Sequence, residues 1–309
     1  MEFVTHLKPR NLPGFLFLAY TTVQTIGAVL LALSGSIWLW LLAQIVFALS
    51  FLQWFVILHE AGHKTLFRHR WLNLITGHIA GFFALIPFYA WQPIHARHHR
   101  WTGWQDRDAT TASLVPRPLA PLERFLIRAA WRTHLPLFSV LYRLNNFWLL
   151  PRVRKYVTPA QHRRIIINVS ALLAVYAAML IGAGGMNVLT YCGLGLVLSL
   201  MIQDPLLLSQ HTHIPQHLSN GQTVKPFPPH AQGQFTRSLR FPKWFSSLIL
   251  HFDAHELHHR YIHVSGYDLH KISAHPQNEV NWWRWLCAVK RLPGDVFLFQ
   301  NQTQTGFML

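Results

Sequence analysis

Cysteine is nearly absent from this sequence: only Cys192 and Cys287 occur among 309 residues. Two thiols exclude a scaffold stapled by several disulfides, and they exclude a metal site built mainly from cysteine. Both residues are interpreted as buried apolar side chains or as free thiols in a reducing compartment. Any metal bound by this chain must therefore be held by other side chains.

Charge is also scarce, and acidic charge is the scarcest. Charged residues make up 12% of the chain, which is about half the share of an ordinary soluble domain. Hydrophobic residues make up 51%, and 27 Lys and Arg face only 11 Asp and Glu, for a net charge of +16. We interpret this excess as a surface that faces phospholipid. The basic residues form no stripe with interleaved aromatics, so nucleic-acid binding is not expected.

Four apolar stretches are long enough to cross a bilayer as helices, which takes roughly 20 residues. They cover residues 13–33, 36–58, 165–185 and 186–208. Short uncharged turns join the first stretch to the second and the third to the fourth, so each pair is predicted to form a hairpin. The first stretch is too long for a signal peptide and lacks its small-residue cleavage site.

Lysine and arginine are missing from all four stretches and from both hairpin turns. Two of them lie in residues 1–12, 16 lie in residues 59–164 and nine follow from residue 225 onward. By the positive-inside rule, both termini and residues 59–164 and 209–309 are expected in the cytoplasm.

A fifth apolar stretch, residues 71–91, has arginines on both flanks. Positive charge at both ends favours a re-entrant or interfacial segment over a fifth crossing. The sequence therefore predicts an all-α integral membrane protein with a single domain over residues 1–309. Four transmembrane helices in two hairpins are joined by a re-entrant segment and a cytosolic helical cap.

Histidine is abundant, and nine of the 21 histidines gather in clusters with helical spacing. They are His59, His63, His95, His98, His99, His211, His255, His258 and His259. Side chains three or four positions apart share one face of a helix, so the members of each cluster can converge. Imidazole suits borderline transition metals, and nine imidazoles exceed what one ion coordinates. We therefore expect two metal ions on the predicted cytoplasmic side.

The order of these clusters resembles the three histidine boxes of membrane fatty acid desaturases. The boxes are His59-x-x-x-His63, His95-x-x-His98-His99 and His255-x-x-His258-His259, and the run Gln210-His211-Thr212-His213 resembles the segment that supplies a further ligand in that superfamily. The resemblance covers most of the chain, from the first hairpin to about Tyr267. The first box, with Glu60 after its first histidine, also resembles that of the related alkane monooxygenases, but the second box has desaturase spacing. The resemblance implies that the nine histidines bind two irons that use O2.

Six further residues are candidates to support the metal ligands: Glu60, Asp204, His213, His251, Asp253 and Glu256. The carboxylates of Glu60, Asp253 and Glu256 are candidates to accept a hydrogen bond from a ligand imidazole and so fix its tautomer, with a solvated helix position as the alternative for Glu60 and Glu256. Asp204 is costly to bury inside a predicted span, which makes it a candidate for function; its alternative is a helix cap beside Pro205. The two histidines either support ligands or have no role there.

The implied reaction is oxidation of an unactivated C–H bond in a fatty acyl chain, carried by a lipid, coenzyme A or acyl carrier protein. The sequence has no His-Pro-Gly-Gly haem motif and no flavin or nicotinamide fingerprint, so a separate electron donor such as a ferredoxin is expected. The positive charge suits such an acidic partner and anionic lipid equally well. Trp54, Phe55, Phe82 and Phe83 are candidates to line an acyl tunnel, with ordinary packing as the alternative.

Three alternatives stay open. A hydroxylase or ketolase of the same superfamily, acting on alkanes, lipids or carotenoids, has the same boxes. His59-Glu60-x-x-His63 also fits an intramembrane zinc protease, although seven clustered histidines would then have no purpose. A histidine-rich metal carrier is the third, although carriers usually place their ligands within spans or in His-rich tracts.

Overall fold

The computed structural model describes residues 6–274 and 276–308, and the chain forms two compact units. The first unit contains the chain up to Gln92 and the segment Arg143–Gln203. The second contains Pro93–Tyr142 and the chain from Asp204 onward. The prediction of one domain over the whole chain is not tested by this division and stays a prediction.

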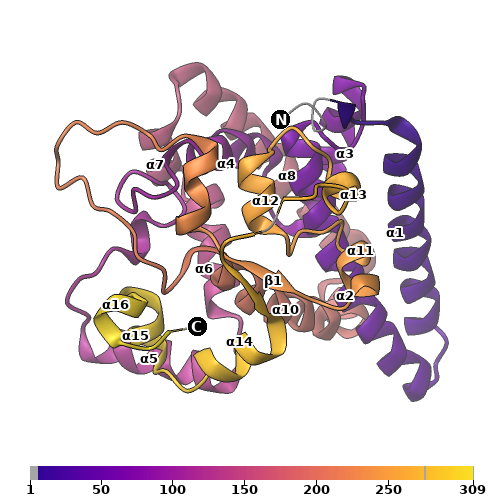
Figure 1. Ribbon diagram of the computed structural model, residues 1–309. Helices are drawn as coiled ribbons and strands as arrows, with labels where there is room; N and C mark the ends of the chain where they lie inside the picture. The colour runs from indigo at the N-terminus through magenta and orange to yellow at the C-terminus, as the bar shows by residue number, and fades with distance from the viewer. Residues whose placement is uncertain (1–5, 275, 309) are drawn as a thin grey trace. The chain divides into compact units, whose positions relative to one another are not determined.

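The first unit is built around long apolar helices. Among the residues that the structure describes, four helices are long and apolar enough to cross a membrane, as the sequence predicted. They are α1 (Asn11–Ala32), α2 (Ile37–His63), α8 (Pro159–Ala183) and a composite helix of α9 (Gly185–Val188), a π-helical turn (Leu189–Gly193) and α10 (Leu194–His211). α1 and α2 run side by side as a hairpin (Figure 1). The remaining helical segments of this unit are α3 (Arg70–Ala84), a π-helical turn (Leu144–Trp148), α7 (Leu150–Val153) and a 3₁₀ turn (Arg154–Tyr156).

Two of these helices extend further than the apolar stretches that predicted them. α2 continues to His63, so the first histidine pair lies in the last turn of a candidate span rather than after it. α8 begins at Pro159 because Thr158 and Gln161 form a capping box, in which each side chain binds the other's backbone N–H. Helix capping therefore moves the start of α8 six residues ahead of its apolar run.

The π-helical turn binds α2 through its backbone. Because a π-helix is wound more widely than an α-helix, some of its carbonyls lack the usual hydrogen bond within the helix, and two of them accept hydrogen bonds from α2. The Trp40 indole N–H donates to the Thr190 carbonyl at 2.9 Å, and the Gln44 side-chain amide donates to the Tyr191 carbonyl at 2.8 Å. The same Gln44 side chain accepts from the backbone N–H of Gly195 at 2.9 Å. A buried amide thus ties α2 to the fourth span.

The fifth apolar stretch does not form one straight helix. It divides into α3 and α4 (Phe88–Trp101), which are bent by 96° at the intervening break. Such a pair is either a broken span or a re-entrant loop. The bend is compatible with the re-entrant segment predicted from the flanking arginines, and the membrane topology stays a prediction.

The second unit consists of short elements. Its helices are the C-terminal part of α4, α5 (Pro121–Thr133), α6 (Leu137–Arg143), α11 (Lys243–Leu248), α12 (His255–Arg260), α13 (Gly266–Leu269), α14 (Trp282–Val289), α15 (Gly294–Phe299) and α16 (Gln302–Thr305). It also has 3₁₀ turns at Ala112–Leu114 and Pro229–Phe235. The predicted helical cap contains two strands as well, β1 (Ser238–Arg240) and β2 (Glu279–Asn281), which pair in parallel. Three-residue strands leave too short a pattern to be recognised in a sequence.

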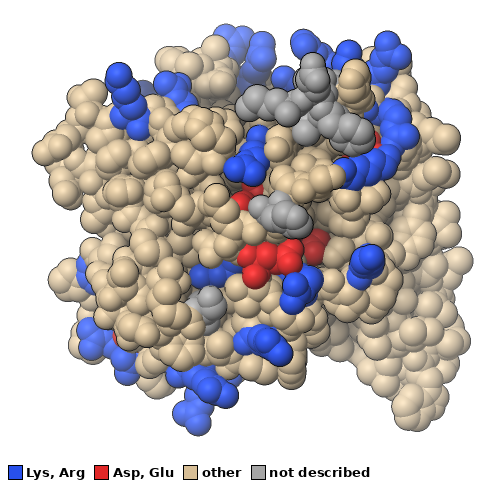
Figure 2. All heavy atoms as spheres, viewed as in Figure 1, with Lys and Arg blue, Asp and Glu red and all other residues tan. Residues whose placement is uncertain are grey.

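An apolar cluster holds the second unit together. Its buried members are Leu208, Leu239, Trp285, Val289 and Phe297. They come from α10, β1, α14 and α15, so one core joins the C-terminal helices to the strand that precedes the third histidine box. On the face in Figure 2, Lys and Arg are spread widely while Asp and Glu gather near the middle.

Arg143 is a buried cation at the end of α6. Its Nε donates to the Ala84 carbonyl at 2.9 Å, and one terminal nitrogen donates to the Gln203 side-chain oxygen at 2.6 Å. The guanidinium also lies 5.7 Å from the centre of the Phe55 ring. The Arg143 side chain therefore links the C-terminal end of α3 to α10 and also contacts α2.

We expect Arg143→Lys to destabilise the protein by about 1.5–3 kcal/mol, because an ammonium cannot make both directed hydrogen bonds of the guanidinium. The measurement is thermal unfolding in detergent. Arg154→Lys is the control, since Arg154 is exposed on the surface of the same unit. Equal melting temperatures for the two variants would contradict this role of Arg143.

Candidate metal centre

Four histidines of the second unit converge on one point. His98 comes from α4, His211 from the end of α10, and His255 and His259 from successive turns of α12. One ligand nitrogen from each lies within 4.8 Å of the others. Three of these four rings are buried and His211 is partly exposed.

An aspartate fixes the His98 ring. The Asp108 carboxylate lies 2.7 Å from His98 Nδ1 and also accepts from the backbone N–H and the hydroxyl of Thr110. Burial alone would raise the pKa of Asp108, but the interaction and hydrogen bond with the His98 ring and the hydrogen bond from Thr110 lower this pKa to about 2. Asp108 therefore stays ionised as an acceptor for Nδ1 of His98, so that a His98 ring with a single proton keeps it on Nδ1 and offers Nε2 to a metal.

Oxygen acceptors fix two more rings in the same way. His211 Nδ1 donates to the Phe235 carbonyl at 3.0 Å, and His259 Nδ1 donates to the Gln232 side-chain oxygen at 2.9 Å. Gln232 cannot reverse this arrangement, because its NH2 group donates to the carbonyls of His99 and Phe227. Burial and neighbouring imidazoles lower the pKa of His259 well below its usual value. His259 is therefore neutral, with its lone pair on Nε2.

These lone pairs face one another. His255 Nε2 lies 2.8 Å from His211 Nε2 and 3.0 Å from His259 Nε2. The single proton of a neutral His255 can satisfy only one of these two contacts, so the other contact has no proton from His255. A cation shared by the three nitrogens would accept their lone pairs, and neutral imidazole is the form that binds transition metals. The donor set thus fits a metal ion on chemical grounds.

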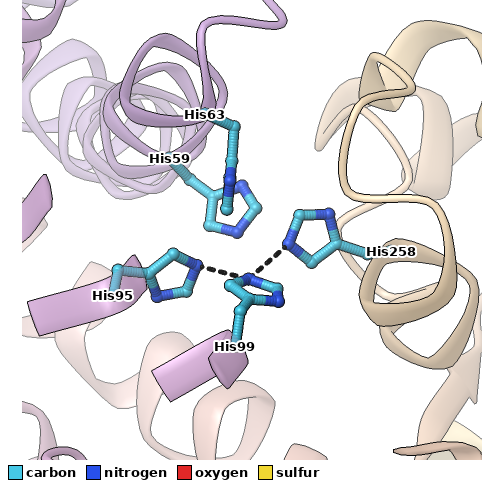
Figure 3. A group of neighbouring side chains, drawn as sticks. All are labelled: His59, His63, His95, His99 and His258. Carbon is cyan, nitrogen blue, oxygen red and sulfur yellow. Dashed lines mark hydrogen bonds between the residues drawn. The ribbon is translucent and has the colours of Figure 1, made fainter. Parts of the chain in front are cut away.

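A second group of three rings lies in the same unit. His99 Nε2 is 3.0 Å from His95 Nε2 and 3.1 Å from His258 Nε2, as the dashed lines in Figure 3 show. All three rings are buried. Because His98 and His99 are adjacent on α4, and His258 and His259 on α12, neighbouring residues send one ring to each group. This explains why the second and third boxes each end in two consecutive histidines.

The remaining pair belongs to the first unit. His59 and His63, also labelled in Figure 3, lie on successive turns of α2 with their ring centres 4.6 Å apart. The Trp91 ring packs against both, with centres 5.6 and 5.7 Å away. This close packing requires Gly62, because a Cβ there would meet the Trp91 ring at 1.9 Å. Glu60 Oε1 lies 3.1 Å from His59 Nδ1, and Thr65 donates to Glu60 Oε2.

Two other carboxylates have different partners from those expected. Glu256 accepts from the backbone N–H groups of Gln277 and Asn278 at 2.7–3.0 Å, so it fixes a loop rather than an imidazole. Asp253 accepts from the Ser246 hydroxyl at 2.6 Å and lines a cavity of about 400 Å³. Burial raises the pKa of Asp253 to about 6. Neither arrangement supplies the expected hydrogen bond to a ligand ring.

The last three candidates support the surrounding structure. His213 binds the C-terminal segment through the Gln300 carbonyl and the Thr305 hydroxyl. His251 faces the ring of His270 at 5.1 Å. Asp204 accepts from the backbone N–H of Ser139 in α6, so it caps another helix rather than its own.

The aromatic candidates for a tunnel pack mostly on one another. Trp54 stacks on Phe83 with ring centres 4.5 Å apart, and Phe55 lies under Arg143. Phe82 alone of the four lines a described cavity, which is about 410 Å³ in volume and lies between α3 and α8. Ordinary packing therefore accounts for three of the four residues.

Sequence reasoning missed Asp108 and Gln232, which orient two of the rings. Asp108 carried a weak signal, as one of only 11 acids and close behind the second box. Gln232 carried none, since it lies 27 residues before His259 in an unpatterned loop. Contacts of this kind are visible only once the chain has folded.

Comparison with known proteins agrees with the histidine pattern. The family model described as fatty acid desaturase matches residues 35–285. The chain belongs to the fatty acid desaturase family. A curated relative from Picosynechococcus sp., named sn-1 oleoyl-lipid 12-desaturase, is 25% identical over 252 residues, which cover 76% of this chain and 68% of the relative. Members of this family are oxidoreductases. Because the chain belongs to this family and has four candidate spans among its described residues, it is a multi-pass membrane protein.

Other relatives match over shorter stretches, with a higher sequence identity but a smaller share of both chains covered. An sn-1 acyl-lipid omega-3 desaturase (ferredoxin) from Nostoc sp. is 31% identical over 101 residues, covering 32% of this chain and 28% of the relative. A Delta(12) fatty acid desaturase from Calendula officinalis is 39% identical over 95 residues, covering 31% and 24%. These stretches span only about a quarter of the relatives' own length, so their activities are attributed to this chain only as a proposal.

Asp108→Asn is expected to weaken iron binding about 10- to 100-fold, because a ligand imidazole loses the carboxylate that orients it. Titration of apoprotein with ferrous iron, read by elemental mass spectrometry, measures this. Asp106→Asn is the matched control, since Asp106 binds Ser219 rather than an imidazole. An iron affinity equal to that of the control would refute the role of Asp108.

Gly62→Ala is expected to displace Trp91 and to cost about 1–3 kcal/mol of stability through overpacking. Thermal unfolding measures the loss of stability, and iron content reports whether His59 and His63 still bind. Gly27→Ala is the control, because a Cβ at Gly27 meets no atom within 4 Å. If Gly62→Ala melts and binds iron as the control does, the close approach of Trp91 is not required.

Proposed function

We propose that this protein is an O2-dependent di-iron desaturase that introduces a double bond into a fatty acyl chain of a lipid. The observation that carries the proposal is the set of converging histidine ring nitrogens in the second unit, within a chain of the fatty acid desaturase family. A resident pair of irons would supply O2 activation and the removal of hydrogen from an unactivated methylene group. Imidazole is the ligand type that such irons accept.

The nine predicted ligands divide between two ions in this proposal. His98, His211, His255 and His259 would hold one iron. His95, His99 and His258 would hold the other, and His59 and His63 of the first box stay the remaining predicted ligands. The protein's own contribution is orientation: Asp108, Gln232 and the Phe235 carbonyl keep protons on Nδ1, so that each Nε2 atom stays available. Glu60 has the same role toward His59.

The proposed substrate is an acyl chain esterified in a membrane lipid. The names of the Picosynechococcus and Nostoc relatives specify acyl-lipid substrates, which favours this carrier over coenzyme A or acyl carrier protein. The Nostoc name also mentions ferredoxin, and the net charge of +16 suits an acidic donor of that kind. Both termini and the histidine boxes would lie in the cytoplasm, where such a donor is available.

A hydroxylase of the same superfamily is the second candidate, because its ligand set would be the same. The deciding experiment expresses the chain in a bacterium with a defined lipid pool and analyses the fatty acids of each lipid class by mass spectrometry. We expect a new double bond in lipid-bound chains. New hydroxyl groups without new unsaturation would favour the hydroxylase.

His98→Ala is expected to abolish the new product and to lower the iron content of the purified protein, because a ring that Asp108 orients is lost. His230→Ala is the matched control, since His230 is an exposed histidine outside all four clusters. Full product formation by His98→Ala would overturn the proposed metal centre, whereas loss of product in both variants would indicate a folding defect.

A further inference from the structure

Helix α5 of the second unit has three distinct faces. With 3.6 residues per turn, its side chains fall into three sectors of about a third of the circumference each. One sector carries Leu122, Phe125 and Leu126, a second carries the arginines, and the third packs on the protein core. An ordinary surface helix needs only an apolar face for the core and a polar face for water.

The core face is firmly held. Trp131 stacks on Phe297 with ring centres 4.8 Å apart, and its indole N–H donates to the Leu292 carbonyl at 3.2 Å. Gly294 lets α15 approach closely, since a Cβ there would meet Trp131 at 2.7 Å. The helix therefore cannot rotate to bury its outer apolar face.

That outer face is unusually exposed. Leu122, Phe125 and Leu126 are 68%, 65% and 51% exposed, and they stand at positions i, i+3 and i+4. Exposed apolar residues continue beyond the helix at Leu135 and Val140. A contiguous patch of large apolar side chains on a rigid helix indicates contact with a partner or a membrane.

The second sector decides which partner fits. Arg124, Arg128 and Arg132 follow one another at intervals of four residues, and all are exposed. Arg128 forms a two-point ion pair with Asp295, which also lies 3.7 Å from Arg124, so the ridge is held in place next to the apolar face. Arginines bordering exposed Leu and Phe on one helix are typical of a helix that lies in the plane of a membrane interface.

We propose that α5 lies flat on an anionic phospholipid surface, with Leu122, Phe125 and Leu126 among the upper acyl chains and the arginine ridge at the phosphates. The charge of the ridge complements anionic lipid, and its guanidiniums match phosphate geometry. The contact anchors the second unit, and thereby two histidine groups, to the bilayer surface. This inference does not depend on the reaction that the protein catalyses.

The test uses the full chain in nanodiscs, with Cys192→Ser and Cys287→Ser to remove the native thiols. Single cysteines are placed at Leu122, Phe125 and Leu126, with Arg124→Cys as the matched control on another face of the same helix. Each carries a nitroxide label, and power-saturation EPR compares collisions with oxygen, which concentrates in bilayers, and with a nickel chelate, which stays in water.

In nanodiscs of phosphatidylglycerol and phosphatidylethanolamine we expect oxygen collisions to exceed nickel collisions at the three apolar positions, with the order reversed at position 124. In phosphatidylcholine alone, the labels at the apolar positions should lie closer to water. If the face instead covers a second copy or an acidic protein, nanodiscs with one chain each leave it in water, and nickel collisions dominate at all four positions. That result would overturn the proposal. If the labels lie equally deep in both lipid compositions, the proposed preference for anionic lipid is wrong.

Discussion

The metal centre depends on which nitrogen of each imidazole holds the proton. A neutral histidine offers a metal the ring nitrogen that carries no proton, and an acceptor for the N–H group of the other nitrogen fixes which one that is. In the second unit these acceptors are three different groups, the Asp108 carboxylate, the Phe235 carbonyl and the Gln232 amide. They come from a loop after α4 and from the turn that precedes β1, so the folding of irregular segments determines the state of the ligands.

Much of the site was predictable because its spacing is local. The boxes place rings on one face of a helix, and α4 and α12 show them there, with consecutive histidines serving different groups. The four spans were predictable for a similar reason, since an apolar run of sufficient length requires only composition to recognise. Their ends were less predictable, because the capping of α8 by Thr158 and the continuation of α2 to His63 depend on single side chains.

Of the supporting residues, Glu60 was named from the sequence and lies 3.1 Å from His59 Nδ1, but Asp108 and Gln232 could not be found from the sequence alone. Glu256 stands beside a ligand in the sequence yet binds a loop, while Gln232 is distant in the sequence yet binds a ligand. Adjacency along a helix puts consecutive side chains about 100° apart, so the nearest acid in the sequence seldom faces the ring beside it. The strands β1 and β2 were missed because three residues carry too little pattern. The π-helical turn was missed because the side chains that bind its carbonyls, Trp40 and Gln44, belong to another helix.

Gln232 also limits how this protein can change during evolution. Its oxygen accepts from His259, and its NH2 group donates to the His99 carbonyl, so one side chain links α12 to α4. Glutamate would keep the acceptor and lose the donor, leucine would lose both, and asparagine would be one methylene too short. A homologue that lacks glutamine here must supply another acceptor for the His259 ring and another donor for the main-chain carbonyl of His99, or change the loop that carries position 232.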